Sequence, residues 1–483
     1  MKLKGTAIIE LTDVNTSEVE TYVEENMVTN AINNILGLNP MAIFYCEEDY
    51  STGLVWTDNL LPICPNMIGG ILLFQKALEE NADKIYVKSD NLPVAYASND
   101  VNSTANTARG SLNLTESKVL DNGYKFVWEF TASQGNGTIA ALALTSALGG
   151  QNGYGSSVAD ASTFLQLKEV DIGTLGLAKQ MVLFETVEVD FKNDMLYSIT
   201  FENSCVIVRK VRIPIFSIGL NEKINDSTYT VLEEKAIPAS TFKFLGDYTL
   251  YGEFLDGQDG YWYGFSNEEN SSGDATMVWV KISKEDYSIE EGSWTLSNTY
   301  LQAVGERATD SSYPERICRC CMRNGYLYVP AYNKKGIYKI NVSNSADVTL
   351  IPFGFTSSGN PLCESGTCEL YLTLIGDLII GGDYQITAAD SVIKTKGNER
   401  LNNAATPLFQ YKHFLLGWGG SYGNEYRTMY LLTPYLATIN NLSSAVVSFR
   451  FVTGIWNVMM KLTRGITLSM RIVQPHLRLW IAR

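Results

Sequence analysis

Hydrophobic and polar residues alternate along much of the chain, which is the two-residue period of a β-strand with one buried face. Residues 4–23 alternate on both sides of a polar break at 13–17, so they predict a β-hairpin. Residues 112–130 predict a second hairpin with its turn at 121–123, because Asp, Asn and Gly tolerate the backbone of a tight turn. Residues 137–146 predict a strand buried on both faces.

One segment near the N-terminus follows the period of a helix. Apolar residues stand at positions 28, 31, 32, 35 and 36, and Gly37 and Pro40 follow them. This spacing predicts a short helix packed on the first hairpin.

A longer pattern recurs in the second half, where a turn, an aromatic or aliphatic strand and another strand follow one another. In one copy Asn324 and Gly325 predict the turn, and Tyr326, Tyr328 and Tyr338 predict aromatic packing between neighbouring sheets. The starts of five copies are separated by 66, 65, 52 and 37 residues, within or above the span of a four-stranded propeller blade. A sandwich or another antiparallel meander would give the same local order. The five copies are residues 193–213, 259–289, 324–344, 376–394 and 413–432.

Composition supports strands over helices. The chain has 483 residues, and its aromatic content of 11%, its 27 Tyr and its 39 Gly are typical of strands and turns. We therefore predict an all-β protein: an N-terminal β-sandwich-like domain with one short helix, followed by a β-propeller-like domain. The predicted domains are residues 1–180, residues 181–445 and an atypical basic C-terminal segment, residues 446–483.

The net charge of −15 excludes nucleic acid as a partner, because phosphate binding requires clustered Lys and Arg. The sequence has no run of about 18 apolar residues and no apolar core of a signal peptide at its start. We expect a protein made in a cytoplasm, without a membrane span and without a cofactor.

The C-terminal segment differs from the rest in residue usage. No Asp or Glu follows Glu425, while seven Lys and Arg residues occur in the last 58 positions. Two explanations stay open: a basic segment that docks on an acidic or membrane surface, and a frameshifted or otherwise aberrant end. Reading the nucleotide sequence beyond codon 447 in the other two frames distinguishes them.

The eight Cys residues raise the question of a metal site, because two short clusters could converge. The combination of C-x-C-C with C-x₄-C is not a recognised zinc spacing, and the chain has two His residues. We therefore expect reduced structural thiols and no metal. The cysteines concerned are Cys318, Cys320, Cys321, Cys363 and Cys368.

Catalytic motifs are absent from the sequence. It contains no G-x-S-x-G, Walker or H-E-x-x-H pattern, so acyl and phosphoryl transfer are not expected and no catalytic residue is assigned. A pair of carboxylates acting on a glycosidic bond leaves no local signature and stays an alternative.

Carboxylates beside aromatic residues predict a candidate ligand site. Aromatic rings stack on the C–H face of a pyranose while carboxylates accept hydrogen bonds from its hydroxyls. The alternative is a set of turn acids beside core aromatics. The candidate ligand-binding residues are Glu253, Asp256, Asp259, Tyr261, Trp262 and Tyr263, and a second group contains Trp418 and Tyr422.

The N-terminal third resembles structural proteins of tailed bacteriophages and prophages, of the tail-fibre or receptor-binding type. The likeness covers about residues 1–180 and lies in MKLKGTAIIELTDVNTSEVETYVEENMVTNAINNILG, in LLPICPNMIGGILLF (60–74), in ARGSLNLTES (108–117) and in DNGYKFVWEFTASQGNGTIAALALTS (121–146). The resemblance implies an N-terminal part that anchors to the particle and a distal β-rich part that meets the host surface. It carries over no site residues.

Two functions from different classes follow. The first is a virion structural protein, a tail fibre or appendage assembled in the host cytoplasm, which binds a host-surface glycan or protein. We expect it to form a homo-oligomer and to contact other virion proteins. The second is a polysaccharide depolymerase on the same scaffold. They differ in carboxylate geometry, because a glycosidase needs two carboxyl groups about 5 to 10 Å apart in a cleft. A scaffold without a ligand is the third option.

Overall fold

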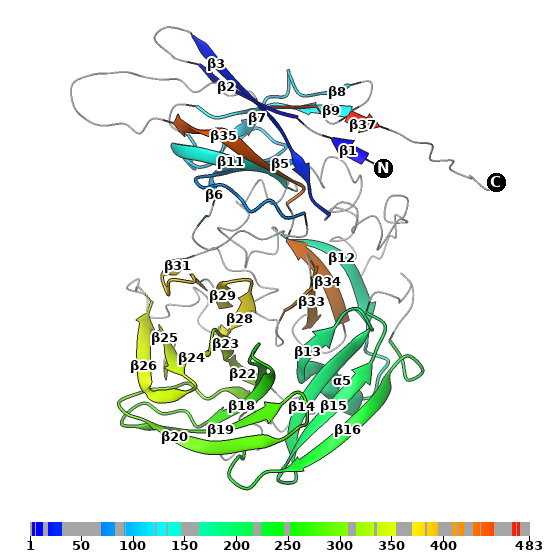
Figure 1. Ribbon diagram of the computed structural model, residues 1–483, viewed down its shortest axis with the longest axis vertical. Helices are drawn as coiled ribbons and strands as arrows, with labels where there is room; N and C mark the ends of the chain where they lie inside the picture. The colour runs from blue at the N-terminus through cyan, green and yellow to red at the C-terminus, as the bar shows by residue number, and fades with distance from the viewer. Residues whose placement is uncertain are drawn as a thin grey trace, which may run out of the picture. The chain divides into compact units, whose positions relative to one another are not determined.

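The computed structural model confirms an all-β chain, whose β-strands form many small sheets (Figure 1). Contacts between Cα atoms divide it into two units. Unit 1 comprises residues 1–158, 162–167 and 433–483, and unit 2 comprises residues 159–161 and 168–432. The structure describes residues 2–4, 6–12, 18–30, 69–82, 91, 93–120, 123–131, 134–145, 164–215, 224–245, 252–307, 315–332, 336–353, 370–381, 384–394, 408–411, 414–419, 428–434, 436–448, 466–469 and 471–473.

Unit 1 contains two five-stranded sheets, drawn as separate layers in Figure 1. The first has the order β4 (Met27–Val28), β35 (Thr438–Ser448), β11 (Gly137–Thr145), β5 (Gly70–Phe74) and β6 (Pro93–Ala97). The second has the order β3 (Val19–Glu25), β2 (Thr6–Thr12), β36 (Ile466–Ser469), β9 (Gly123–Phe126) and β8 (Lys118–Leu120). Two strand pairs complete it: β1 (Lys2–Lys4) with β37 (Arg471–Val473), and β7 (Ser111–Leu112) with β10 (Trp128–Glu129).

The predicted hairpins and the buried strand of this unit are confirmed. Strands β2 and β3 pair in antiparallel register, and so do β8 and β9. Strand β11 lies between β5 and β35, and Ala141 and Ala143 are fully buried on it. Small side chains allow sheet faces to be covered closely on both sides, as the sequence predicted.

The helix predicted near the N-terminus begins later than the apolar spacing indicates, since Asn30 is helical and Val28 is not. Val28 belongs to β4, which pairs with Thr438 of β35, because tertiary pairing overrides the local apolar period. Residues 31–36 lie outside the described part of the chain. The sequence also missed α5 (Leu177–Phe184), an eight-residue helix whose last residues, Leu183 and Phe184, are buried. No helix in the described ranges has the length and hydropathy needed to cross a membrane.

The basic C-terminal segment contributes strands to unit 1. Strand β36 pairs with β2 and β9, and β37 pairs with β1. The predicted domain boundaries are at residues 180 and 445, and the structure divides the chain near residues 167 and 432. Residues 433–483 belong to the same unit as the N-terminal residues.

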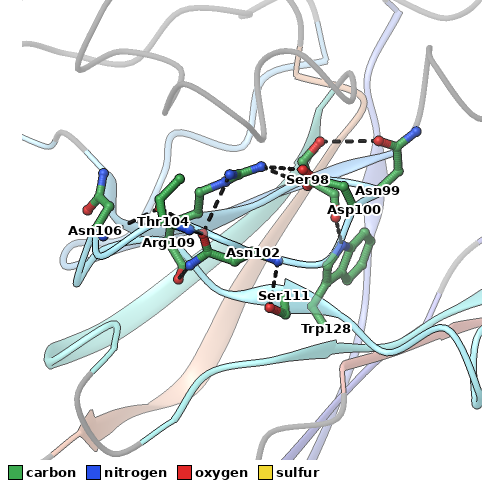
Figure 2. Close-up of polar contacts among 9 residues, drawn as sticks. All are labelled: Ser98, Asn99, Asp100, Asn102, Thr104, Asn106, Arg109, Ser111 and Trp128. Atoms are coloured by element: carbon green, nitrogen blue, oxygen red, sulfur yellow. Dashed lines mark hydrogen bonds and ion pairs between the residues drawn. The ribbon is translucent and has the colours of Figure 1, made fainter.

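A polar loop in unit 1 is organised around Arg109, which is 5% exposed (Figure 2). Its Nη2 donates to both carboxylate oxygens of Asp100 at 2.7 Å, and the side-chain amide of Asn102 donates to the Arg109 carbonyl. Beside it, the indole Nε1 of the fully buried Trp128 donates to the Ser98 carbonyl at 2.8 Å. A charge-assisted pair and a satisfied indole therefore hold the loop without regular secondary structure.

Five four-stranded sheets follow along the chain, which we number in chain order. Sheet 1 is β13 (Thr186–Asp190), β14 (Met195–Glu202), β15 (Cys205–Arg212) and β16 (Thr230–Pro238). Sheet 2 is β17 (Glu253–Asp256), β18 (Tyr261–Asn267), β19 (Ala275–Ser283) and β20 (Ile289–Leu296). Sheet 3 is β23 (Cys321–Arg323), β24 (Tyr326–Pro330), β25 (Gly336–Asn341) and β26 (Asn344–Pro352).

Sheet 4 is β28 (Thr373–Ile375), β29 (Leu378–Gly381), β30 (Tyr384–Ile386) and β31 (Val392–Lys394). Sheet 5 is β32 (Phe409–Tyr411), β33 (Phe414–Gly419), β34 (Thr428–Pro434) and, as its fourth strand, β12 (Phe164–Asp171). A small sheet of β21 (Gly305–Arg307), β22 (Glu315–Arg319) and β27 (Leu370–Tyr371) accompanies them. Strand β12, which comes before sheet 1 in the chain, thus joins the three strands that come last in these sheets. Its residues 168–171 belong to unit 2 and its residues 164–167 to unit 1.

The contacts between these sheets follow a cyclic order. Hydrophobic clusters join sheet 1 to sheet 2, sheet 2 to sheet 3 and sheet 3 to sheet 4. The backbone N–H of Leu408, before β32, donates to Thr373 of sheet 4 at 3.3 Å. The ring of Tyr411 in sheet 5 stacks on Phe191, which follows β13 of sheet 1, with centroids 5.2 Å apart. Each sheet therefore contacts the next, and the fifth contacts the first.

The repeated pattern read from the sequence corresponds to the middle strands of these sheets. Copy 193–213 contains β14 and β15, and copy 324–344 contains β24 and β25. The predicted turn at Asn324 and Gly325 is confirmed, since both residues have positive φ, 54° and 76°. The all-β prediction is confirmed, and the propeller stays a prediction that the cyclic contacts support.

A carboxylate links the outer strands of sheets 1 and 2. Glu291 on β20 accepts hydrogen bonds from the backbone N–H groups of Ser240, Thr241 and Phe242, at 2.8, 2.9 and 2.8 Å. Burial raises the pKa of Glu291, but the hydrogen bonds from Phe242 and Ser240 outweigh it and lower this pKa to about 2.

Glu291 is expected to make part of the stability of unit 2 depend on pH. Its pKa is depressed on folding, so its contribution is complete above the ordinary pKa of 4.5 and is lost as pH falls towards about 2. Thermal unfolding from pH 7 to pH 2 should therefore show that Glu291→Gln is less stable than wild type at pH 7, with the two curves converging near pH 2. A constant difference across this range would contradict the assignment.

Candidate functional site

The residues predicted to bind a ligand lie around β17 and β18, but on two faces of sheet 2. Side chains alternate between the faces of a strand, so Trp262 packs towards sheet 1 while Tyr263 packs towards sheet 3. Tyr261, two residues before Tyr263, lies on the sheet 3 side. The six neighbouring residues in the sequence therefore do not form one site.

Glu253 belongs to the core and not to a ligand surface. It is 2% exposed, and its Oε1 accepts from Nε of Arg319, which is 3% exposed, at 2.5 Å. Its Oε2 accepts from the backbone N–H of Cys320 at 3.0 Å. Burial with a paired cation corrects the predicted role: Glu253 ties the first strand of sheet 2 to the chain that enters sheet 3.

Asp256 and Trp262 meet two residues that the sequence did not single out. Nζ of Lys284 lies 2.7 Å from Oδ1 of Asp256 and 2.6 Å from Oε2 of Glu188, and that same oxygen accepts from Nε1 of Trp262 at 2.9 Å. Burial lowers the pKa of Lys284, but the hydrogen bonds to Asp256 and Glu188 outweigh it, so this pKa is raised. Trp262 is 1% exposed and is part of the core.

Asp259, Tyr261 and Tyr263 form a smaller group on the other face. The Tyr263 hydroxyl donates to Oδ2 of Asp259 at 2.7 Å, and burial followed by this hydrogen bond raises the pKa of Tyr263. Nζ of Lys281 lies 3.9 Å from the centroid of the Tyr261 ring. The ammonium group therefore covers the face of Tyr261 that a sugar would need.

The second predicted group divides between the core and the undescribed chain. Trp418 on β33 is fully buried and so has no surface for a ligand. Tyr422 lies outside the described residues.

Comparison of the repeats identifies Tyr261 and Lys281 as part of the scaffold. In sheet 3, Nζ of Lys339 lies 4.3 Å from the centroid of the Tyr326 ring. Lys281 is paired across the sheet with Tyr263, as Lys339 is with Tyr328, so the two pairs occupy matching positions. A contact that recurs in successive sheets is explained by the fold.

The same comparison reveals two tryptophans that the sequence analysis missed. Trp279 lies two residues before Lys281, and the matching residue before Lys339 is Ile337. Trp279 pairs across the sheet with Gly292, and Ile337 pairs with Ile351. Two residues further along these last strands stand Trp294 and Phe353.

We call Trp279, Trp294 and Gly292 the tryptophan patch. Ile337 and Phe353 are 1% and 2% exposed, whereas both tryptophans are partly exposed. Their ring centroids lie 5.9 Å apart at an angle of 31°. A Cβ atom at position 292 would lie 3.0 Å from the indole of Trp279, so the glycine allows the ring to lie against the strand.

Three of the candidate metal-binding cysteines lie in the core. Cys318, Cys320 and Cys321 are buried, while Cys363 and Cys368 lie outside the described residues. Burial raises the pKa of Cys320 well above its ordinary value and that of Cys321 to about 12. Within the described ranges, no three His, Cys, Asp or Glu side chains are grouped to hold a metal ion.

The loop of Figure 2 also contains oxygen-bearing residues at every second position, Asp100, Asn102, Thr104 and Asn106. This spacing resembles the start of a calcium-binding loop. The guanidinium of Arg109, however, binds both oxygens of Asp100, and Oδ1 of Asn102 accepts from the backbone and hydroxyl of Thr104. An internal cation and internal hydrogen bonds thus use these oxygens.

Comparison with known proteins assigns no family. No family model and no curated protein matches the sequence. Among solved structures, the chain is similar to the AfRom2 CNH domain at 9% identity and a TM-score of 0.24, covering 62% of this chain and 82% of that one. It is similar to a protein from Lactobacillus plantarum (10% identity, TM-score 0.20, covering 59% and 86%) and to the polysaccharide lyase Uly1 (12%, 0.19, 78% and 100%). Likenesses this weak support no conclusion about fold or activity.

Proposed function

We propose that the chain is a virion structural protein of a tailed bacteriophage or prophage, which attaches to the particle through its N-terminal part and binds a host-surface receptor or glycan through unit 2. The resemblance of residues 1–180 supports the first half of this proposal. The tryptophan patch supports the second, because partly exposed large aromatics are the side chains that dominate binding surfaces.

The cyclic contacts of unit 2 support a β-propeller-like domain as the carrier of this surface. A single four-stranded sheet cannot bury both of its faces, so each of the five sheets needs a neighbouring sheet on either side. Pairing β12 with β32–β34 gives every sheet four strands and joins the two ends of the domain. A rigid scaffold of this kind presents loops and sheet edges to a partner.

The geometry favours binding over glycan hydrolysis. The carboxylates of Glu188 and Asp256 both contact Lys284, and Glu188 accepts a hydrogen bond from Trp262. Two nearby carboxylates beside an aromatic residue are the arrangement that a glycosidase uses. Lys284 lies between them and contacts both, so the space for a glycosidic bond is filled by a cation of the protein itself.

The proposal is tested with the purified full-length chain and with phage particles induced from the strain that carries the gene. We expect mass spectrometry to find the chain in the particles, and the purified chain to bind intact host cells saturably and to reduce adsorption of those particles. Particles without the chain would refute the virion role, and a chain that neither binds cells nor competes with the particles would refute receptor binding.

A further inference from the structure

The tryptophan patch is the place where sheet 2 departs from its neighbours. In sheet 1 Tyr197 pairs with Lys210, as Tyr263 pairs with Lys281 in sheet 2, so Val208 has the position of Trp279. Val208 pairs with Lys235, and Ile237, two residues further on, has the position of Trp294. Val208 is 2% exposed, and the matching Ile337 of sheet 3 is 1% exposed. The scaffold is therefore built with aliphatic side chains at this position, and it does not require the indole of Trp279.

The shape of the patch is that of a platform. Gly292 opposite Trp279 removes the side chain that would lift the indole away from the strand. Trp294 continues the aromatic surface and packs on Phe265, with centroids 5.8 Å apart. The two adjoining indoles are partly exposed and pack on the core cluster below them, and aromatic rings of this kind stack on the C–H face of a sugar ring.

The opposite side of the seam is also apolar. Val342 and Val348 of sheet 3 pack against the same hydrophobic cluster as the two tryptophans. Leu350, paired with the inward-facing Tyr338 of that cluster, is 44% exposed. A ligand at the patch would therefore meet aromatic groups on one side and aliphatic groups on the other.

The charges nearest the patch favour a neutral ligand. Lys281 lies over the ring of Tyr261, and its Nζ is 3.9 Å from Oε1 of Glu290, so the local positive charge is already paired within the protein. The net charge of −15 repels a polyanion at long range. An anionic polysaccharide would find no free cationic partner among these residues.

We propose that the tryptophan patch binds neutral pyranose residues of a cell-surface polysaccharide by stacking of Trp279 and Trp294 on their C–H faces. This inference rests on the proposed receptor-binding function and specifies its ligand. It makes unit 2 a lectin-like module whose specificity lies in sheet 2.

The test measures binding of the full-length chain to neutral glucan, galactan and mannan, and to polygalacturonate as an anionic control. Binding to at least one neutral polymer is expected, with a loss of about tenfold or more in Trp279→Ala and in Trp294→Ala. Gly292→Ala should weaken binding by displacing the indole without removing it, and Trp294→Tyr should retain most of it. Tyr22→Ala in unit 1 is the matched control and should bind as wild type does.

The outcomes separate this inference from the function on which it rests. An unchanged melting temperature shows that a variant is folded. If an alanine variant does not fold, the binding affinity of Trp294→Tyr is measured in its place. If the chain binds host cells and the folded patch variants bind them equally well, the inference is wrong while receptor binding stands. If the chain binds neither cells nor any neutral polymer, both are wrong.

Discussion

Replacement of Arg319 by alanine is expected to destabilise unit 2 by about 3–5 kcal/mol, because it leaves a buried carboxylate without its cation. Glu253 is 2% exposed, and the groups that still donate to it after the change include the backbone N–H and the thiol of Cys320, which carry no charge. The pair joins sheet 2 to the chain that enters sheet 3, so the loss should lower cooperativity across that seam. Urea unfolding of the unit 2 transition measures the effect.

A double variant provides the control for this prediction. Glu253→Met with Arg319→Met removes both charges and keeps apolar volume, and such exchanges are often close to neutral. We therefore expect the double variant to be more stable than Arg319→Ala alone. A single variant that loses less than about 1 kcal/mol, the size of an exposed ion pair, would contradict the buried geometry.

Replacement of Asp390 by alanine is expected to cost about 2–4 kcal/mol and to loosen sheet 3 from sheet 4. Oδ1 of Asp390 accepts from Nη2 of Arg323 at 2.8 Å and from the Tyr328 hydroxyl at 3.0 Å, while Oδ2 lies 2.6 Å from Nζ of Lys339. Arg323 is 5% exposed, so its charge would be left buried beside two carbonyl groups. Asp390 therefore neutralises two cations of the preceding sheet.

Asparagine and glycine at position 390 distinguish the loss of charge from the loss of the side chain and from backbone strain as causes of the destabilisation. Asp390 has φ of +58°, which asparagine tolerates and alanine does not, so Asp390→Asn removes the charge with little backbone strain. Asp390→Gly removes the side chain without that strain. The expected order of stability is wild type, then Asn, then Gly and Ala. An asparagine variant as stable as wild type would place the effect in the shape of the site and not in its charge.

The sequence predicted the middle strands of unit 2 because these strands alternate apolar residues between two covered faces. It missed the outer strands, since β16 is exposed along most of its length and carries no apolar period. It also missed first strands such as β23 and β28, which span three residues each. Pairing of β12 with β34 joins residues far apart in the chain and leaves no local signal.

The candidate site was predicted in part. The carboxylates and aromatics around β18 were found, but composition cannot tell that Trp262 is buried or that Lys281 covers Tyr261. The tryptophans of the patch had a usable signal. Aligning the strands that follow the Tyr-x-Tyr strands on Lys281 and Lys339 gives Trp279 and Ile337 the same position. A tryptophan where another repeat has an aliphatic residue indicates a local function.

The central claim is that the ring of five sheets is closed by β12, so that the sheet carrying the tryptophan patch is held between two neighbours. Hydrogen exchange of the full-length chain tests it most directly. We predict that the β12 amides that face β34 exchange as slowly as those of β33, because β12 is the fourth strand of sheet 5. Exchange of β12 at the rate of an unfolded segment, while β14 and β15 stay protected, would contradict the closure.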